Sequence, residues 1–237
     1  MKPVNSRSMK NSSPGRFGCR ATWTRCQGVS EAYTVARVAS LKASTRHGEI
    51  TAREIKGDAI ARSSNGDLTL ENVGGAVDAA ATNGSLNVRN AGDLRANLTV
   101  GDVVAACVKG RAEVNTVSGS IQLVGVGGDV EANSTSGEVT FAGRIRADGR
   151  YRLKSISGAI EMHIQQDAPG FTVTLTTWNG DIETLFPLKL DSQASGGSTN
   201  RRITGRFGNG GAQLVLDSFS GGVRLAKAKA DELKTCK

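Results

Sequence analysis

Glycines recur every nine residues over more than half of the chain, and this spacing limits the fold more than any other feature. The interval is nine from Gly48 to Gly84 and again from Gly92 to Gly137, with one step of eight between the two series. A fixed period of this kind is typical of solenoid proteins, in which each repeat packs only on its neighbours. The glycines that we assign to corners are Gly48, Gly57, Gly66, Gly75, Gly84, Gly92, Gly101, Gly110, Gly119, Gly128, Gly137, Gly158 and Gly180.

Each of these glycines precedes a short stretch in which apolar and polar residues alternate. After Gly66 the sequence reads Asp-Leu-Thr-Leu, and after Gly119 it reads Ser-Ile-Gln-Leu. Alternation with a period of two indicates a β-strand with one buried face. A further apolar residue often stands seven positions after the glycine, as in Val73, Val117 and Ile156. We expect the chain to bend before this position, so that the seventh residue also points inward.

Two kinds of corner alternate along the chain. Alternate glycines follow small polar residues such as Asn65 and Ser118, whereas the others follow residues such as Gly74 and Lys109. We therefore predict an all-β fold, a parallel β-solenoid with coils of about 18 residues, each made of two nine-residue halves. Strands of successive coils would stack about 4.8 Å apart. Glycine is expected at the corners because positive φ is needed there and side chains do not fit.

The distribution of aromatic residues fits a narrow apolar interior. The chain has two Trp, two Tyr and six Phe residues, and none lies between Tyr33 and Phe141. We expect rows of Val, Leu, Ile and Ala to fill the interior and aromatic rings to cap its ends. The expected parts are a basic, Ser-rich segment at 1–32, a solenoid domain at 33–226 with loops near 142–150 and 187–211, and a polar tail at 227–237.

The net charge of +8 is concentrated near the start of the chain. Residues 1–62 contain twelve basic and four acidic side chains, whereas residues 63–237 contain eighteen of each. The basic segment has no recognised nucleic-acid-binding fold, so nucleic acid is not an expected partner. No run approaches the 18 or so apolar residues of a transmembrane helix.

The four cysteines are too few and too scattered for a disulfide scaffold. Cys19 and Cys26 match no metal-binding spacing. Cys107 lies beside the core position Val108 and is interpreted as a corner or core thiol, and Cys236 as part of the tail.

Aspartate follows glycine at several corners, and two interpretations are open. The carboxylates either stabilise and solvate the turns or bind calcium, which in related solenoids requires acidic residues in every loop. Ala76 and Ser85 interrupt the acidic series, which favours the turn role, and we predict no metal and no cofactor. The aspartates are Asp58, Asp67, Asp93, Asp102, Asp129 and Asp181.

No catalytic residue is predicted, and the chain is expected not to be an enzyme. The only histidines, His47 and His163, are far apart along the rod, which argues against a catalytic triad or a zinc site. Asp93 and Arg111 occupy equivalent places in adjacent coils and are expected to lie close, as a surface ion pair. A polysaccharide-processing enzyme, which needs a carboxylate cluster on one face, is the least favoured alternative.

Trp178 and Phe171 are the candidate binding residues. They flank a corner near the C-terminal end, where an exposed ring could stack on a sugar of a glycan. The competing interpretation is that these rings cover the open end of the core. The expected ligand is a protein or a glycan on a surface.

Several segments resemble a bacterial domain family of unknown function that carries the label adhesin. The resemblance rests on units such as Asn65-Gly-Asp-Leu-Thr-Leu, Ser118-Gly-Ser-Ile-Gln-Leu and Asn179-Gly-Asp-Ile-Glu-Thr, and on the ending Ser220-Gly-Gly-Val. It covers about residues 33–226 and implies a glycine-rich repeat protein of the cell envelope, exported to the periplasm or the cell surface. Residues 1–30 show no signal peptide. They are expected to be a disordered tail, a patch for acidic partners, or the result of a misplaced start.

These observations lead us to expect a non-enzymatic, adhesin-like surface or envelope interaction protein. The alternative is a self-assembling structural scaffold, because solenoids expose strand edges at both ends and can stack end to end. The loop at 187–211 and the polar tail are expected to block such stacking.

Overall fold

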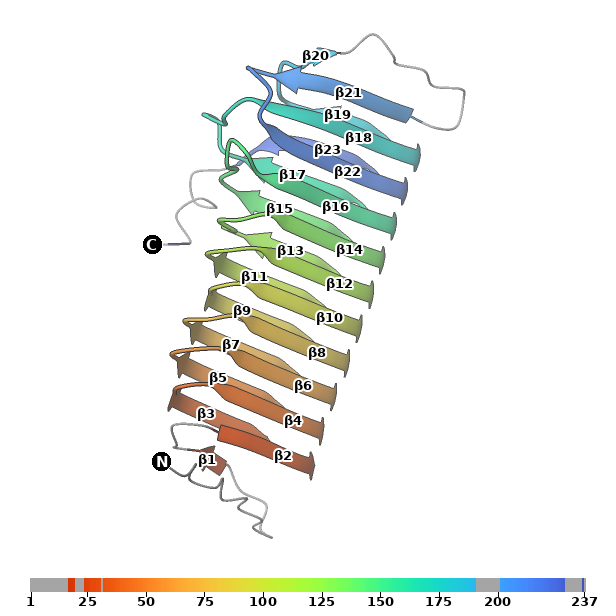
Figure 1. Cartoon of the computed structure of the whole chain (residues 1–237). Helices are drawn as coiled ribbons and strands as arrows, with labels where there is room; N and C mark the ends of the chain where they lie inside the picture. The colour runs from red at the N-terminus through yellow and green to blue at the C-terminus, as the bar shows by residue number, and fades with distance from the viewer. Residues whose placement is uncertain (1–16, 20–23, 31, 191–200, 229–235, 237) are drawn as a thin grey trace.

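The chain folds into a parallel β-solenoid, as the glycine period predicts. The computed structural model describes residues 17–19, 24–30, 32–190, 201–228 and 236, and these contain β-strands but no helix. The strands are stacked in one column from β1 and β2 near the N-terminus to β20 and β21 at the far end (Figure 1). Within the described part, no helix is long and apolar enough to cross a membrane.

Two sheets form the long sides of the rod. The first sheet contains, in spatial order, β1 (Phe17–Cys19), β3 (Tyr33–Val38), β5 (Ile50–Ile55), β7 (Leu68–Val73), β9 (Leu86–Ala91), β11 (Val103–Val108), β13 (Ile121–Val124), β15 (Val139–Gly143), β17 (Ile160–Ile164), β23 (Val223–Lys227) and β19 (Ile182–Thr184). The second sheet contains, in spatial order, β2 (Thr24–Ser30), β4 (Leu41–His47), β6 (Ala59–Asn65), β8 (Val77–Asn83), β10 (Leu94–Val100), β12 (Ala112–Ser118), β14 (Val130–Ser136), β16 (Arg150–Ser157), β22 (Ala212–Ser220), β18 (Phe171–Asn179), β21 (Arg201–Phe207) and β20 (Lys189–Leu190).

Residues one coil apart lie side by side, which places equivalent side chains in columns along the rod. Leu68 of β7 is paired with Ile50 on one side and with Leu86 on the other, each 18 residues away. All three side chains are buried in the interior between the sheets. The second sheet contributes mainly small inward residues, such as Ala61 and Ala79, so the interior stays narrow and closely packed.

The predicted glycines lie at the corners, but the two corners use them differently. From Gly48 to Gly137, the glycines of one corner have φ between 130° and 151°, a region that favours glycine. At the other corner the requirement is close approach instead: a Cβ on Gly92 would lie 2.6 Å from the carbonyl oxygen of Gly75. The expectation of positive φ at every corner glycine is therefore wrong for one of the two sets.

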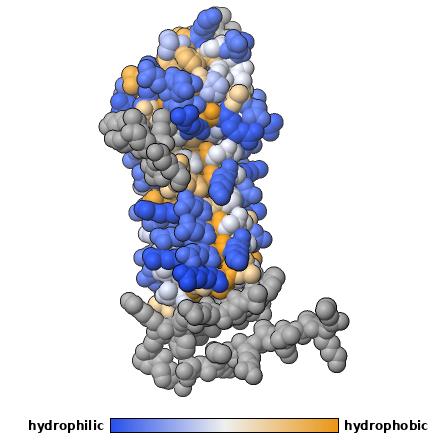
Figure 2. All heavy atoms as spheres, turned by 90° about the vertical axis from the view of Figure 1, so that its left-hand side faces the viewer, coloured by the Kyte–Doolittle hydropathy of each residue, from blue (hydrophilic) through white to orange (hydrophobic). Residues whose placement is uncertain are grey.

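Viewed from the left-hand side of Figure 1, the rod shows columns of hydrophilic side chains with apolar residues between them (Figure 2). The columns follow from the register, because each coil repeats the polar and apolar positions of the coil before it.

The C-terminal coils are stacked out of sequence order. Strand β22 lies between β16 and β18, and β23 lies between β17 and β19. The last coil of the chain therefore fills a gap between two earlier coils, rather than adding to the end. Beyond β18 the pairing becomes antiparallel, first with β21 and then from β21 to β20.

The expected domain limits need two corrections. The segment at 1–32 contains strands β1 and β2, which pair with β3 and β4, so the solenoid begins before residue 33. The loop expected at 187–211 contains β20 and β21. Residues 1–16 and most of the tail at 227–237 lie outside the described residues.

The loop expected near 142–150 lies between β15 and β16 and is held by buried polar groups. Oε1 of Gln165 accepts a hydrogen bond from the Ile145 N–H (2.8 Å), and its Nε2 donates to the Ile145 carbonyl (3.2 Å). The Tyr151 hydroxyl accepts a hydrogen bond from the Arg146 N–H (3.0 Å). Burial raises the pKa of Tyr151 above its ordinary value of 10.0.

Candidate functional site

Five of the six aspartates of the Gly-Asp pairs stabilise the corners, whereas Asp181 pairs with the side chain of Arg201. Oδ1 of Asp67 accepts a hydrogen bond from the backbone N–H of Ser85, and Oδ1 of Asp102 accepts one from Ser120, each at 2.7 Å. Each carboxylate thus fastens the corner of the coil 18 residues further along the chain. Asp58, Asp93 and Asp129 make the same bond to Ala76, Arg111 and Arg150 at 2.8 to 3.0 Å. The described residues contain no group of three or more His, Cys, Asp or Glu that could hold a metal.

The other charged residues singled out in the sequence do not form a common site. Asp93 bonds the backbone of Arg111, whose guanidinium pairs instead with Glu131 at 3.1 Å. The expected side-chain ion pair between Asp93 and Arg111 is therefore replaced by a turn contact. His163 lies on β17 beside Glu161, with 3.4 Å between Nε2 and Oε2, and His47 ends β4 several coils away.

Three phenylalanine rings close the C-terminal end of the core. Phe171 is fully buried, with ring centroids 5.1 Å from Phe207 and 5.5 Å from Phe186. A buried ring cannot stack on a sugar from solution, so the binding role predicted for Phe171 does not hold. Its alternative role, covering the open core, agrees with the geometry.

Trp178 is exposed and lies at one end of a row of exposed apolar side chains. Its indole stacks on the ring of Phe219, with centroids 5.9 Å apart and planes 13° apart. Ile156 and Val117 occupy the equivalent position on β16 and β12, and Thr135 of β14 lies between them. The exposed fractions are 45% for Trp178, 53% for Phe219 and Ile156, and 52% for Val117. We call these four residues the apolar row.

The apolar row corrects the expected orientation of the seventh residue after each glycine. Val73 is buried, as expected, but Val117 and Ile156 point outward. In the first sheet the residue before this position has positive φ, as in Asn72 (φ 57°), and this bend turns the next side chain inward. The second-sheet strands have no such bend, so strict alternation carries the seventh residue outward.

An open groove of about 660 Å³ runs across the second sheet beside the apolar row. On its other side is a ladder of asparagines, in which Nδ2 of Asn115 donates to Asn97 (3.1 Å) and Nδ2 of Asn133 donates to Asn115 (2.9 Å). Lys154 on β16 and Asp217 on β22 continue the asparagine ladder across the sheet. The groove therefore combines amides and an ion of each sign with aliphatic and aromatic side chains.

Hydroxyls beneath the groove fasten the strands to the corners. The side chains of Ser134 and Ser155 are buried and donate to the carbonyls of Gly119 (3.1 Å) and Gly137 (3.0 Å). Because these bonds repeat from coil to coil, the groove rests on a rigid base.

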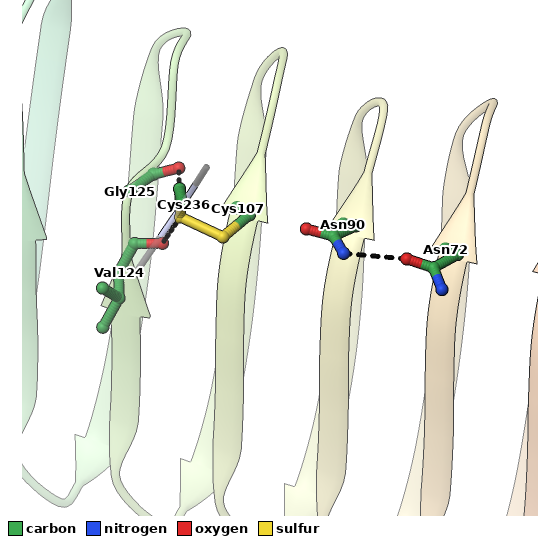
Figure 3. Close-up of a disulfide and its surroundings, with 6 residues drawn as sticks. All are labelled: Asn72, Asn90, Cys107, Val124, Gly125 and Cys236. Carbon is green, nitrogen blue, oxygen red and sulfur yellow. Dashed lines mark hydrogen bonds between the residues drawn. A yellow bond between two sulfur atoms is a disulfide. The ribbon is translucent and has the colours of Figure 1, made fainter. Parts of the chain in front are cut away.

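A disulfide joins Cys107 of β11 to Cys236 of the tail, a pairing that the sequence interpretation missed (Figure 3). Cys107 has φ 61° and belongs to the column of positive-φ residues that also contains Asn72 and Asn90, which are linked by a hydrogen bond of 2.8 Å. The next member of this column is Gly125, and a Cβ there would collide with the sulfur of Cys236. The sequence signal for a disulfide at Cys107 was the glycine one coil further along this column, at Gly125. This signal does not identify Cys236 as the partner of Cys107.

No curated protein and no solved structure matches the chain significantly. The family model described as Toastrack DUF4097 matches residues 29–226. This match spans every coil from β3 to β23, including the out-of-order one, and the chain therefore belongs to the Toastrack DUF4097 family.

Proposed function

We propose that the chain is a non-enzymatic, adhesin-like interaction protein of a bacterial surface or envelope, and that its ligand binds along the groove and the apolar row. The observation that carries this proposal is the exposed stack of Trp178 on Phe219, continued by Ile156. Exposed apolar side chains gathered on one face are typical of interaction sites. Tryptophan in particular supplies a large contact area together with a polar N–H.

The residues that line the groove support binding rather than catalysis. Asn97, Asn115 and Asn133 offer amides, and their neighbours offer hydroxyls and aliphatic groups. Apart from Lys154 and Asp217, the lining groups form hydrogen bonds and apolar contacts but do not transfer protons near neutral pH.

The disulfide supports an exported location. Disulfides persist in oxidising compartments such as the periplasm and the cell surface, and are rare in the bacterial cytosol. The bond between Cys107 and Cys236 therefore agrees with the envelope location that we propose.

We do not propose the self-assembling scaffold, because the C-terminal end is protected. Strand β20 has only two residues and pairs antiparallel with β21, whose Arg202 and Arg206 are exposed. Short edge strands with charged side chains hinder the addition of a further strand.

The proposal is tested with the double variant Trp178→Ala/Phe219→Ala. We expect it to bind an array of bacterial surface glycans at least about tenfold more weakly than the unmodified chain, because the groove loses the Phe219 ring and the apolar row loses Trp178. The matched control is Leu185→Ala, which removes another half-exposed apolar side chain, outside the apolar row. Equal binding by the double variant and the control would contradict the proposed function.

A further inference from the structure

Basic side chains gather on the outer face of the second sheet, although the repeat region as a whole is neutral. Acidic residues are found largely at the corners, where aspartates such as Asp67 and Asp102 bond to backbone amides. From β4 onward, the acidic residues of the second-sheet strands are Asp78, Glu113, Glu131 and Asp217. The basic residues of the same strands are Lys42, Arg46, Arg62, Arg95, Arg150, Arg152, Lys154, Lys189, Arg201, Arg202 and Arg206. The fold therefore creates a basic face that the charge totals do not reveal.

Toward the N-terminal end of this face, ion pairs neutralise part of the charge. Arg62 pairs with Asp78 at 3.1 Å, and Arg95 pairs with Glu113 at 3.4 Å. Toward the C-terminal end, fewer of the basic side chains of this face are neutralised by ion pairs. Among the ion pairs between described residues, none includes Arg152, Lys154 or Arg202, although all three side chains are exposed.

The register places these basic residues around the apolar row. Lys154 on β16 is followed across the sheet by Asp217 on β22, Thr176 on β18 and Arg202 on β21. Lys154 and Arg202 are thus three strand spacings apart, which is about 14 Å. A parallel line leads from Arg150 through Gln213 and Thr172 to Arg206.

The strip between these two basic strands is mostly uncharged. Its outward residues include Thr172, Thr174 and Thr176 of β18, all half-buried, and Val215 of β22. The ring of Trp178 and that of Phe219 border the strip on one side. Asp217 is the single acidic side chain on these strands, and it lies next to Lys154.

We infer that this face binds an anionic polysaccharide, one that carries carboxylate, sulfate or phosphate groups. This inference rests on the proposed function, because it assigns a ligand class to the same face. Lys154 and Arg202 would bind acidic groups, the threonine hydroxyls and the Asn133 amide would bond sugar hydroxyls, and the apolar row would contact the C–H face of the sugar rings. One unit of an extended polysaccharide is comparable in length to the strand spacing, so each strand faces about one sugar.

The aromatic geometry favours a polysaccharide over a single-stranded nucleic acid. Nucleic-acid-binding proteins offer free aromatic faces on which bases stack. Here Trp178 and Phe219 stack on each other, so each ring already uses one face. The stack leaves no gap between the two rings into which a base could insert, whereas the C–H groups of a sugar ring can still contact its outer side.

The test compares binding of the full-length chain to four immobilised probes: polygalacturonate, neutral dextran, single-stranded DNA and phosphatidylglycerol vesicles. We expect binding to polygalacturonate that weakens as salt is added, because exposed charges are screened. Lys154→Glu/Arg202→Glu should reduce this binding at least about tenfold. The matched control, Lys42→Glu/Arg46→Glu, makes the same change of net charge on β4 of the same sheet and should change binding less than about twofold.

Each outcome separates the inference from the proposed function. One outcome would overturn the assignment of an anionic ligand but retain the proposed function. In it, the chain binds dextran as strongly as polygalacturonate, and this binding is unaffected by the charge reversals but lost in Trp178→Ala/Phe219→Ala. Stronger binding to DNA or to vesicles than to polygalacturonate would overturn the assignment of a polysaccharide as the ligand. Binding to none of the probes would overturn this inference, and the surface-glycan array then decides the function separately. The milder variant Lys154→Gln/Arg202→Gln, checked by circular dichroism, guards against loss of folding.

Discussion

At the scale of single residues, the coil is defined by a few polar contacts that repeat every 18 positions. Asp102 fastens the corner of the following coil through the Ser120 N–H, and Asn90 bonds Asn72 where the backbone has positive φ. Parallel stacking brings equivalent positions together, so a side chain that forms such a contact in one coil can form the same contact in the next.

The corner bond of Asp102 can be tested by removing its acceptor. Asp102→Ala should lower the free energy of unfolding by about 1 kcal/mol, because the Ser120 N–H loses its partner at an exposed corner. Asp102→Asn keeps the Oδ1 acceptor and should cost less. Denaturant unfolding followed by circular dichroism measures both, and equal losses in the two variants would refute the role of the acceptor.

Tyr151 gives a pH dependence at the alkaline end. Because burial raises its pKa in the folded state, the folded chain holds the proton more tightly than the unfolded chain does. This contribution to stability is complete below the unfolded pKa of about 10 and is lost as the pH rises through the folded value. In Tyr151→Phe the alkaline fall in melting temperature should be smaller. An identical fall in this variant and in the unmodified chain would contradict the assignment.

At the scale of elements, strand parity decides which residues face the solvent. In β18, Phe171, Val173 and Leu175 share one parity and are buried, whereas Trp178 has the opposite parity and is exposed. The sequence therefore contained the distinction between the two candidate rings. It was not evident for Val117 and Ile156, because their orientation depends on a backbone bend that only the first sheet has.

Cys236 is joined covalently to β11 through its disulfide with Cys107. Cys236→Ser should lower the free energy of unfolding by about 2–4 kcal/mol, since the bond closes a long loop. A reducing agent should have the same effect on the unmodified chain and little further effect on Cys236→Ser. Unfolding curves with and without reductant measure this, and a reductant effect of equal size in both proteins would show that the bond is not responsible.

Gly125 provides an independent check of the same contact. Gly125→Asn keeps a residue that tolerates positive φ but places a side chain where the sulfur of Cys236 lies. We expect more free thiol per chain in this variant than in the unmodified protein, as measured with a thiol-reactive dye. No increase in free thiol would contradict the crowding at this position.

At the scale of the whole molecule, the period of glycine predicts the rod but not the order of its last coils. The stretch from Ala212 to Leu216 has the same alternation as neighbouring strands such as β14 and β18, so it fits between two coils as well as on top of one. The basic face cannot be recognised from the sequence for a similar reason. Lys154 and Arg202 are far apart in sequence, and only the insertion of β22 together with the reversal into β21 fixes their separation at three strands.

The out-of-order coil also bears on how the protein is made. A ribosome delivers β18 and β19 before β22 and β23, yet the latter provide the surface on which the former rest. Early coils can assemble as they emerge, but the C-terminal part of the second sheet must wait for β22, which lies between β16 and β18. A chain that terminates before β22 would thus lack Phe219, the neighbour on which Trp178 packs, and under the proposed function it would bind its ligand more weakly.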